Sequence, residues 1–196
     1  MERKTDKLYL IAERQQGFFT AAQAVACGYP TSGHVYHLKA GTWRREYRGI
    51  YRLVRFPMSD DEQYVLWSLW SRNRLGVPQG VYSHQTALAL FELSDLMPKR
   101  LHLTVPPDFR RSTSIPEILV LHRGRFAPDE WEERRGYRVT RPLRAVADLL
   151  ADASVSKDHL RQALEQGLES GLITRAEFGR HPMCGELKDL MTRRRK

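Results

Sequence analysis

The amino-terminal quarter of the chain carries hydrophobic residues at helical spacing. Leu8, Ile11 and Ala12 follow this spacing and predict a helix over residues 4–15. Thr20 then precedes "AAQAVACG", where its hydroxyl can cap a short helix and the glycine can end that helix. The pattern therefore predicts two helices joined by a turn.

A third helix and a pair of strands follow. Residues 31–40 form a short helical pattern in which Val35 and Leu38 are the expected inward positions. Two segments rich in β-branched and aromatic residues, 43–47 and 50–55, flank an Arg-Gly turn, which is a hairpin pattern. Helix, short helix, turn, short helix and hairpin is the order of a winged helix-turn-helix.

The rest of the chain mixes helical and strand patterns. Ser59 and Glu62 form a predicted capping box at the start of a helix, and Ser83 is the predicted cap of the next helix. Strands are predicted at 101–105, 118–122 and 137–139, and further helices at Pro142 and at 157–172. A frayed basic tail is predicted at 193–196.

The expected fold class is α/β (α+β), in two parts. An amino-terminal winged helix-turn-helix is expected at residues 1–56, and a mixed α/β carboxy-terminal domain at residues 59–190. The charge follows this division. Residues 1–56 contain ten Lys and Arg against four Asp and Glu, which is six of the nine net positive charges of the chain. A polyanionic partner is therefore expected for the first part.

The winged helix order indicates which residues would contact DNA. In such domains the second short helix enters the major groove, and the hairpin lies over the phosphate backbone or reaches into the minor groove. The candidate DNA-binding residues are Ser32, Gly33, Tyr36, His37, Lys39, Arg44, Arg45, Arg48 and Arg52. Alternatively, the arginines of the hairpin lie flat across Tyr47 and Tyr51 as a solvated face.

The remaining composition points to a reducing compartment. Cys27 and Cys184 are the only cysteines, which is neither a disulfide framework nor a metal site. The segment after Met1 lacks the apolar region of a secretory signal, and no segment is apolar enough to span a bilayer. The expected location is cytoplasmic, with no membrane partner and no cofactor.

Patterns of nuclease and nucleotide-binding chemistry are poorly matched. Nucleases of the PD-(D/E)xK kind place an acidic residue and a lysine a few tens of residues after an aspartate. Asp108 and Asp129 precede the "ELK" at 186–188 by longer separations. The sequence contains neither a G-x-x-x-x-G-K nor a G-x-G-x-x-G loop. An enzymatic function is therefore not expected.

The histidines and serines give no clear catalytic or metal pattern either. Ser83, His84 and Asp95 lack the nucleophile elbow of a hydrolase. His102 and His122 alternate out of two predicted strands and could approach each other if those strands are adjacent. A third ligand with zinc-like spacing is lacking, so hydrogen-bonded or solvated histidines are expected and no metal is predicted.

Longer stretches of the sequence resemble one family. "GFFTAAQAVACGYPTSGHVYHLKAGTWRREYRGIYRL" resembles the amino-terminal domain of AbiEi-type antitoxins, with "RGIYRL" as its wing. "VYSHQTALALFELSDLMPKRLHLTVP" and "YRVTRPLRAVADLL" are similar to paired blocks of the family's carboxy-terminal domain. The resemblance runs from about residue 10 to 175. Pro30 departs from the pattern, because a Ser or Thr helix cap is expected there.

The resemblance implies an antitoxin and transcriptional autorepressor. Such a protein binds double-stranded DNA at inverted repeats in its own promoter, where two copies can pair. It also counteracts a nucleotidyltransferase-like toxin in systems tied to phage defence, an activity that needs the second domain and need not involve direct toxin contact. The alternative function is a protein-interaction module that binds an acidic partner or a toxin without DNA specificity.

Four residues of the family blocks are candidates for a role in the second domain. They are His84, Thr86, Arg144 and Asp148. Arg144 and Asp148 are four residues apart on a predicted helix, where such a pair also has a purely structural explanation. His84 and Thr86 begin a predicted helix, so they could equally form part of its first turn.

Overall fold

The computed structural model describes residues 3–192, so the predicted basic tail at 193–196 lies outside the described part of the chain. The chain divides into two compact units. The first comprises Met1–Gly80 and Glu133–Arg138, and the second comprises Val81–Glu132 and Val139–Lys196.

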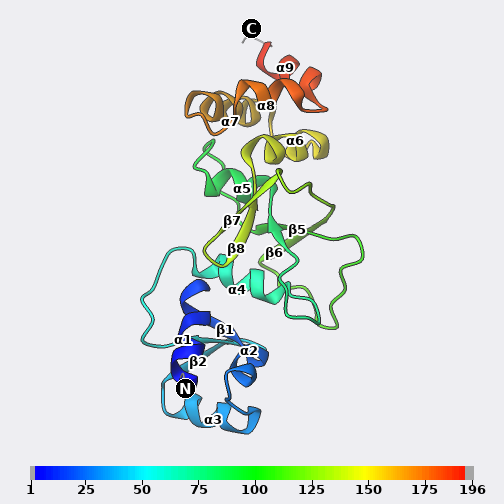
Figure 1. The fold of residues 1–196 in the computed structure, drawn as a ribbon. Helices are drawn as coiled ribbons and strands as arrows, with labels where there is room; N and C mark the ends of the chain where they lie inside the picture. The colour runs from blue at the N-terminus through cyan, green and yellow to red at the C-terminus, as the bar shows by residue number, and fades with distance from the viewer. Residues whose placement is uncertain (1–2, 193–196) are drawn as a thin grey trace. The chain divides into compact units, whose positions relative to one another are not determined.

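The first unit contains the predicted winged helix-turn-helix (Figure 1). Its elements are α1 (Lys4–Arg14), β1 (Phe18–Thr20), α2 (Ala21–Ala26), α3 (Thr31–Lys39), β2 (Trp43–Tyr47), β3 (Ile50–Leu53) and α4 (Glu62–Trp70). Strand β1 was not anticipated, because its three residues are too few to show an alternating pattern. The predicted order of helices and hairpin is confirmed.

Local capping explains where α2 begins. The Thr20 side chain accepts a hydrogen bond from the backbone N–H of Gln23, while the Gln23 side chain accepts one from the Thr20 N–H. This reciprocal capping box satisfies two of the donors that a helix start leaves unpaired. After the helix, Gly28 has a φ of +92°, a left-handed conformation that glycine adopts at little cost.

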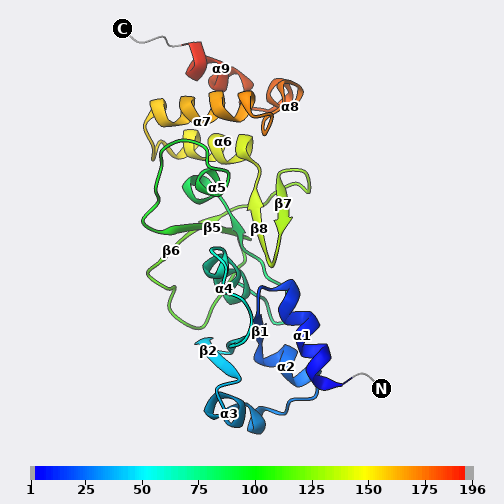
Figure 2. The same cartoon turned by 90° about the vertical axis from the view of Figure 1, so that its left-hand side faces the viewer.

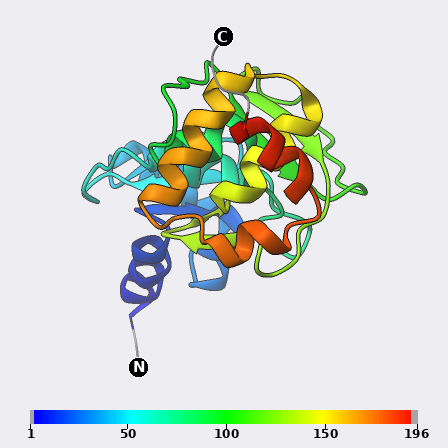
Figure 3. The ribbon, with the colours of Figure 1, turned by 90° about the horizontal axis from the view of Figure 1, so that it is seen from above.

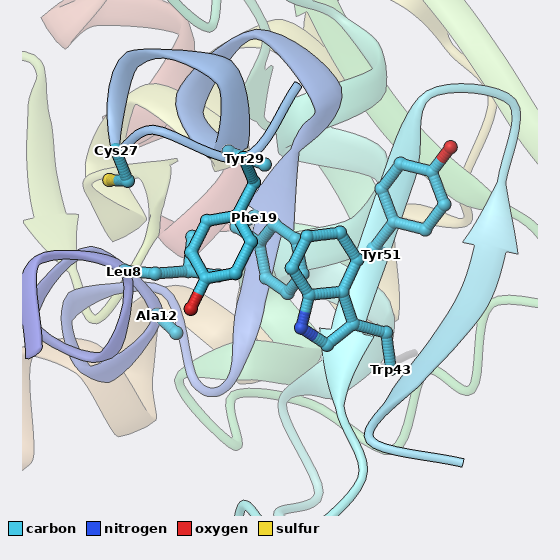
Figure 4. Close-up of a cluster of buried hydrophobic side chains, with 8 residues drawn as sticks. Leu8, Ala12, Phe19, Cys27, Tyr29, Trp43 and Tyr51 are labelled. Carbon is cyan, nitrogen blue, oxygen red and sulfur yellow. The ribbon is translucent and has the colours of Figure 1, made fainter. Parts of the chain in front are cut away.

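The three short strands form one sheet in the order β1-β3-β2, with both pairs antiparallel. Aromatic side chains of this sheet join residues of the helices in one buried cluster. Figure 2 shows α1 and α2 beside β1, which they both contact. Figure 4 shows Trp43 between Tyr29 and Tyr51, with Phe19 beside them. The Phe19 and Trp43 rings meet edge to face, with centroids 4.8 Å apart. The buried cluster comprises Leu8, Ala12, Phe19, Ala24, Cys27, Tyr29, Trp43 and Tyr51.

Helix α4 contacts all three strands of this sheet. It begins at Glu62 with Asp61 before it, so the prediction that Ser59 caps the helix is wrong. The Ser59 hydroxyl instead donates to the Gln16 side chain, and only the Ser59 N–H bonds to the Glu62 carboxylate. By its contacts the first unit thus extends beyond residue 56, while the division into a DNA-binding part at 1–56 and a second functional part at 59–190 stays a prediction.

A second sheet has five strands in the order β6-β5-β4-β8-β7, and most of its residues belong to the second unit. The strands are β4 (Val81–Tyr82), β5 (Leu101–Val105), β6 (Leu119–Arg123), β7 (Trp131–Arg134) and β8 (Tyr137–Thr140). Strand β5 runs parallel to β6 and antiparallel to β4, which in turn pairs in parallel with β8. The mixed sheet confirms the predicted α/β class, and the short β4 and the strand β7 were not predicted.

Helices complete the second unit. They are α5 (His84–Leu90), α6 (Pro142–Asp152), α7 (Lys157–Glu169), α8 (Arg175–Arg180) and α9 (Cys184–Thr192). Helix α6 contacts both α5 and α7, and α7 also contacts α9. Figure 3 shows α9 in red above the sheet, with the yellow and orange helices α6 and α7. Proline at the first position of α6 agrees with the predicted helix start. Within residues 3–192, the helices are all too short or too polar to cross a bilayer.

Candidate functional site

The register of α3 differs from the one that the sequence predicts. His34 is 3% exposed, and its Nε2 atom lies 3.1 Å from the Tyr29 carbonyl oxygen. Its ring also meets Trp43 and Tyr51 edge to face. Val35 is 55% exposed, so its assignment as an inward residue is wrong.

His34 occupies the inward position of α3 because its ring packs against Trp43 and Tyr51 while its Nε2 atom reaches the carbonyl oxygen of Tyr29. Leu38 is partly buried and packs against the core, as predicted. His34 and Leu38 are four residues apart and therefore lie on the same face of the helix.

Five residues of α3 are exposed: Thr31, Ser32, Val35, Tyr36 and Lys39. Tyr36 is 70% exposed. Gly33 is half-buried, and a Cβ built on it would meet only the Pro30 side chain, at 3.9 Å. The lack of a side chain at Gly33 is therefore not required by packing within the protein.

His37 contributes to packing more than to the outer surface. Its ring stacks on Trp43 with centroids 4.5 Å apart, and its Nδ1 atom lies 3.2 Å from the Thr42 hydroxyl. Burial lowers the pKa of His37, and the positive charge of Lys4 adds to the effect. The imidazole is therefore neutral at neutral pH and adds no charge to the helix surface.

The hairpin β2–β3, residues 43–53, is the wing of the domain. Side chains alternate between the two faces of a strand, so Arg44 and Arg45 leave β2 on opposite sides. Arg45 lies opposite Tyr51, on the face that α3 packs against, and is exposed. Arg44 lies on the other face, where its guanidinium pairs with Glu46. The four predicted arginines of the wing therefore do not share one surface.

Arg52 is an internal residue, which corrects its assignment as a DNA contact. It is 2% exposed and its guanidinium lies above the Phe18 ring. The Nη2 atom donates to the carbonyl oxygens of Phe56 and Pro57, at 3.1 and 2.9 Å, and to the Glu62 carboxylate at 2.5 Å. Because Glu62 opens α4, Arg52 ties the wing to that helix.

Five exposed polar and basic candidates remain after these corrections: Ser32, Tyr36, Lys39, Arg45 and Arg48. We call them together the α3–wing surface. The charged members are all exposed, and Arg48 lies at the hairpin turn, where Gly49 adopts a φ of +69°. Lys39 comes from α3, Arg45 from β2 and Arg48 from the hairpin turn, and α3 contacts β2. The surface can therefore meet an anionic backbone with helix and wing together.

In the second unit, Arg144 links three side chains. Its Nε atom donates to Asp148 at 2.8 Å, as the spacing predicts, and its Nη1 atom donates to Glu130 at 2.6 Å. The guanidinium also lies 4.8 Å from the centre of the Phe126 ring. Burial raises the pKa of Asp148 despite the lowering effect of Arg144.

A surface pocket of about 390 Å³ adjoins this network. It is lined by Ala127, Asp129, Glu130, Arg141, Leu143, Arg144, Glu177, Arg180, His181 and Pro182. The acidic and basic side chains in the lining are mixed, so the pocket does not select one sign of charge.

Thr86 is fully buried in the structure and has a clear packing role. Its hydroxyl oxygen accepts a hydrogen bond from the backbone N–H of His102 at 2.8 Å. Thr86 lies on α5 and His102 on β5, so this bond joins a helix to a central strand of the sheet.

His84 belongs to a cluster that the sequence analysis identified only in part. His102 and His122 do approach each other, as their alternation suggests, and His102 Nδ1 lies 3.0 Å from His122 Nε2. The His84 ring stacks on His122 with centroids 3.6 Å apart. Asp152, at the end of α6, places its Oδ2 atom 3.1 Å from His84 Nε2 and 3.8 Å from His122 Nδ1. We call His84, His102, His122 and Asp152 the histidine cluster.

Burial sets the protonation of this cluster. It lowers the pKa of His84 to about 4, with the nearby His122 as the next cause, and it lowers the pKa of His102 to about 4 in the same way. The pKa of His122 is also lowered by burial, while Asp152 opposes the shift. The three imidazoles are therefore neutral at neutral pH.

Ser83, His84 and Asp152 form a chain that superficially resembles a hydrolase triad. His84 Nδ1 lies 2.8 Å from the Ser83 hydroxyl oxygen, which in turn lies 2.7 Å from the Thr104 hydroxyl. Ser83 is fully buried, so this hydroxyl cannot reach a substrate. The bond to Thr104 also corrects the prediction that Ser83 caps α5 through its side chain. Asp95 instead accepts a hydrogen bond from Gln162.

Comparison with known proteins finds a family similarity in the amino-terminal part of the chain. Residues 6–54 match the family model described as "Transcriptional regulator, AbiEi antitoxin". No curated protein matches the chain. Among solved structures, the RV2827C protein from Mycobacterium tuberculosis matches with a TM-score of 0.48 and 13% sequence identity, covering 100% of this chain and 83% of that chain. Over residues 6–54, the chain is therefore similar to the AbiEi antitoxin family of transcriptional regulators.

Proposed function

We propose that the protein is a sequence-specific DNA-binding antitoxin that represses its own operon and counteracts a nucleotidyltransferase-like toxin. The α3–wing surface is the observation that carries the DNA-binding part. It combines Lys39, Arg45 and Arg48 with exposed polar side chains on the helix that such domains place in the major groove.

The side chains of this surface differ in which parts of DNA they are suited to contact. Arg45 and Arg48 are suited to phosphates, because the wing of such domains lies over the backbone. Lys39 can reach either a phosphate or the acceptor atoms of guanine, and Ser32 and Tyr36 can donate hydrogen bonds. An inverted repeat would engage two copies of the chain, which would meet on the DNA.

Salt dependence tests whether the proposed cations contact phosphates. Each phosphate that a protein neutralises on duplex DNA contributes about −0.9 to the slope of log affinity against log salt. Contacts from Arg45, Arg48 and Lys39 therefore predict a slope near −3 per protomer, by the same relation. The Arg45→Ala, Arg48→Ala double variant should lower operator affinity several-fold and reduce the slope by about 2.

The measurement is fluorescence anisotropy with the DNA upstream of the protein's own gene, at several salt concentrations. A matched control is the Arg110→Ala, Arg125→Ala variant, which removes two exposed arginines from the second unit. Retained affinity and an unchanged slope for the wing variant would contradict the DNA-binding assignment.

The same titration decides between the two functional classes. A protein-interaction module that uses its basic wing on an acidic partner would show no preference for the upstream DNA over competitor DNA. A repressor should bind that DNA more tightly than competitor DNA. When the protein is supplied in trans, it should also lower expression from a fusion of this promoter to a reporter gene. The wing variant should lose this repression and the control variant should keep it.

Antitoxin activity is proposed for the second unit, in keeping with the family resemblance. A nucleotidyltransferase-like gene beside this one would identify the toxin. Co-expression of this protein with that toxin should restore the growth of cells that the toxin inhibits. The wing variant should restore growth as well, because the antitoxin activity is assigned to the second unit and not to the wing. Loss of rescue in the wing variant would place the antitoxin activity on the DNA-binding surface instead.

A further inference from the structure

The histidine cluster brings together three metal-ligating side chains from separate elements of the second unit. His84 is the first residue of α5, His122 lies in β6, and Asp152 is the last residue of α6. One ligand atom from each of these residues lies within 4.8 Å of the others. Imidazole nitrogens and a carboxylate oxygen are ligands that zinc accepts in proteins.

The spacing of these atoms is close to what zinc requires. Bonds of 2.0–2.1 Å in a tetrahedral complex place neighbouring ligand atoms about 3.3–3.4 Å apart. His84 Nε2 and Asp152 Oδ2 are 3.1 Å apart, and His122 Nδ1 and Asp152 Oδ2 are 3.8 Å apart. The rings of His84 and His122 are stacked with an interplanar angle of 13°, so they would have to tilt toward the ion to bind it together.

Each histidine has a partner for the nitrogen that faces away from Asp152. His84 can donate from Nδ1 to the Ser83 hydroxyl, and Ser83 can donate to Thr104. His122 can donate from Nε2 to Nδ1 of His102. With these partners as acceptors, His84 Nε2 and His122 Nδ1 would each present a lone pair on the Asp152 side. Such outer partners orient the ligands of protein metal sites.

Two residues of this region have left-handed backbone conformations. His84 has a φ of +54° and Ala153, directly after Asp152, has a φ of +49°. These left-handed conformations are unfavourable for residues other than glycine and accumulate at functional sites. Asp152 also places its carboxylate at the negative end of the α6 dipole, where a nearby cation would be stabilising.

We propose that His84, His122 and Asp152 bind one Zn²⁺ ion, with His102 and Ser83 as hydrogen-bonded outer partners. The site is accessible, because Asp152 is 45% exposed and His122 is 22% exposed, which leaves an open side for the ion and a bound water. The ion would fasten the start of α5, the strand β6 and the end of α6 to one another. This inference is independent of the proposed function on DNA.

Zinc binding to the full-length chain tests the proposal. Protein dialysed against a chelator is titrated with zinc chloride in competition with a chromophoric chelator, and one equivalent should bind per chain. Asp152→Asn and His122→Gln should each weaken binding at least tenfold. His102→Leu should weaken it about 10–100-fold, the range typical for loss of an outer partner. His159→Gln is the matched control, because His159 lies on α7 and bonds to Ser156.

Asp152→Asn is the decisive variant, because it removes the proposed carboxylate ligand with little change in side-chain size, and the Asp152 side chain is 45% exposed. Circular dichroism checks that every variant is folded. Cobalt supplies a second readout, since a tetrahedral Co²⁺ complex absorbs visible light far more strongly than an octahedral one. The proposal is overturned if the parent protein binds less than half an equivalent of zinc, if Asp152→Asn binds it as tightly as the parent, or if His159→Gln abolishes binding.

Discussion

Substitution of Arg52 tests the role that the structure gives this residue. The sequence suggested that Arg52 contacts DNA, whereas its burial indicates that it stabilises the fold. Its guanidinium makes three hydrogen bonds and is 2% exposed. Arg52→Ala would leave the Glu62 carboxylate and two backbone carbonyls without this donor. Removing one partner of a buried ion pair typically destabilises a protein by about 3–5 kcal/mol.

The expected effect here is somewhat smaller, because the Glu62 side chain is 18% exposed and water can partly replace the lost partner. We expect Arg52→Ala to lower the free energy of unfolding by about 2–4 kcal/mol. With an m value of about 2 kcal/mol/M, the midpoint of urea unfolding should fall by about 1–2 M. Arg45→Ala, an exposed control in the same hairpin, should change the free energy of unfolding by about 0.5 kcal/mol or less.

Both variants would be unfolded in urea and followed by tryptophan fluorescence. Operator affinity would be measured separately, at a temperature where Arg52→Ala is fully folded. The folded Arg52→Ala protein should keep the salt slope of the parent. The reasoning is refuted if Arg52→Ala unfolds at the same urea concentration as Arg45→Ala while its salt slope drops.

Two further predictions concern packing. Gly17 has a φ of +90°, and a Cβ there would lie 2.8 Å from the Phe56 side chain, so Gly17→Ala should destabilise by about 2–4 kcal/mol. Gly41 has a φ of +66°, but a Cβ there would have no atom within 4 Å. Gly41→Ala should therefore lower the midpoint of thermal unfolding far less than Gly17→Ala, and equal decreases for the two variants would contradict this. Thr86→Val should destabilise by about 1–3 kcal/mol, because the buried N–H of His102 loses its acceptor. Thr86→Ser keeps the hydroxyl, and urea unfolding should show it to be the milder change.

The sequence pattern was a good guide to the winged helix because its features are local. Helix spacing, the cap at Thr20 and the Arg-Gly turn each depend on neighbouring residues, and α1, α2, α3 and the hairpin all appear where they were expected. The short strands β1 and β4 were missed because two or three residues show no period. Their pairing depends on residues far away in the sequence.

The burial of individual polar residues was the hardest feature to predict. His34 and Arg52 look like surface residues in a basic segment, yet each finds buried partners that only the fold supplies. The histidine cluster shows the same limit. The approach of His102 and His122 could be anticipated from two alternating strands, but Asp152 comes from the end of a distant helix and carries no pattern that links it to them.

Helix α6 carries Arg144, Asp148 and Asp152 at intervals of four residues, so all three project from one side of a single rigid rod. The helix is therefore held by side-chain contacts at both ends. Near its start Arg144 pairs with Glu130, and at its end Asp152 contacts His84. A substitution that removes one of these contacts leaves the helix held only by the other, so that it can rotate about that contact. Mutations at Arg144 and at Asp152 should therefore not act independently on the stability of this unit.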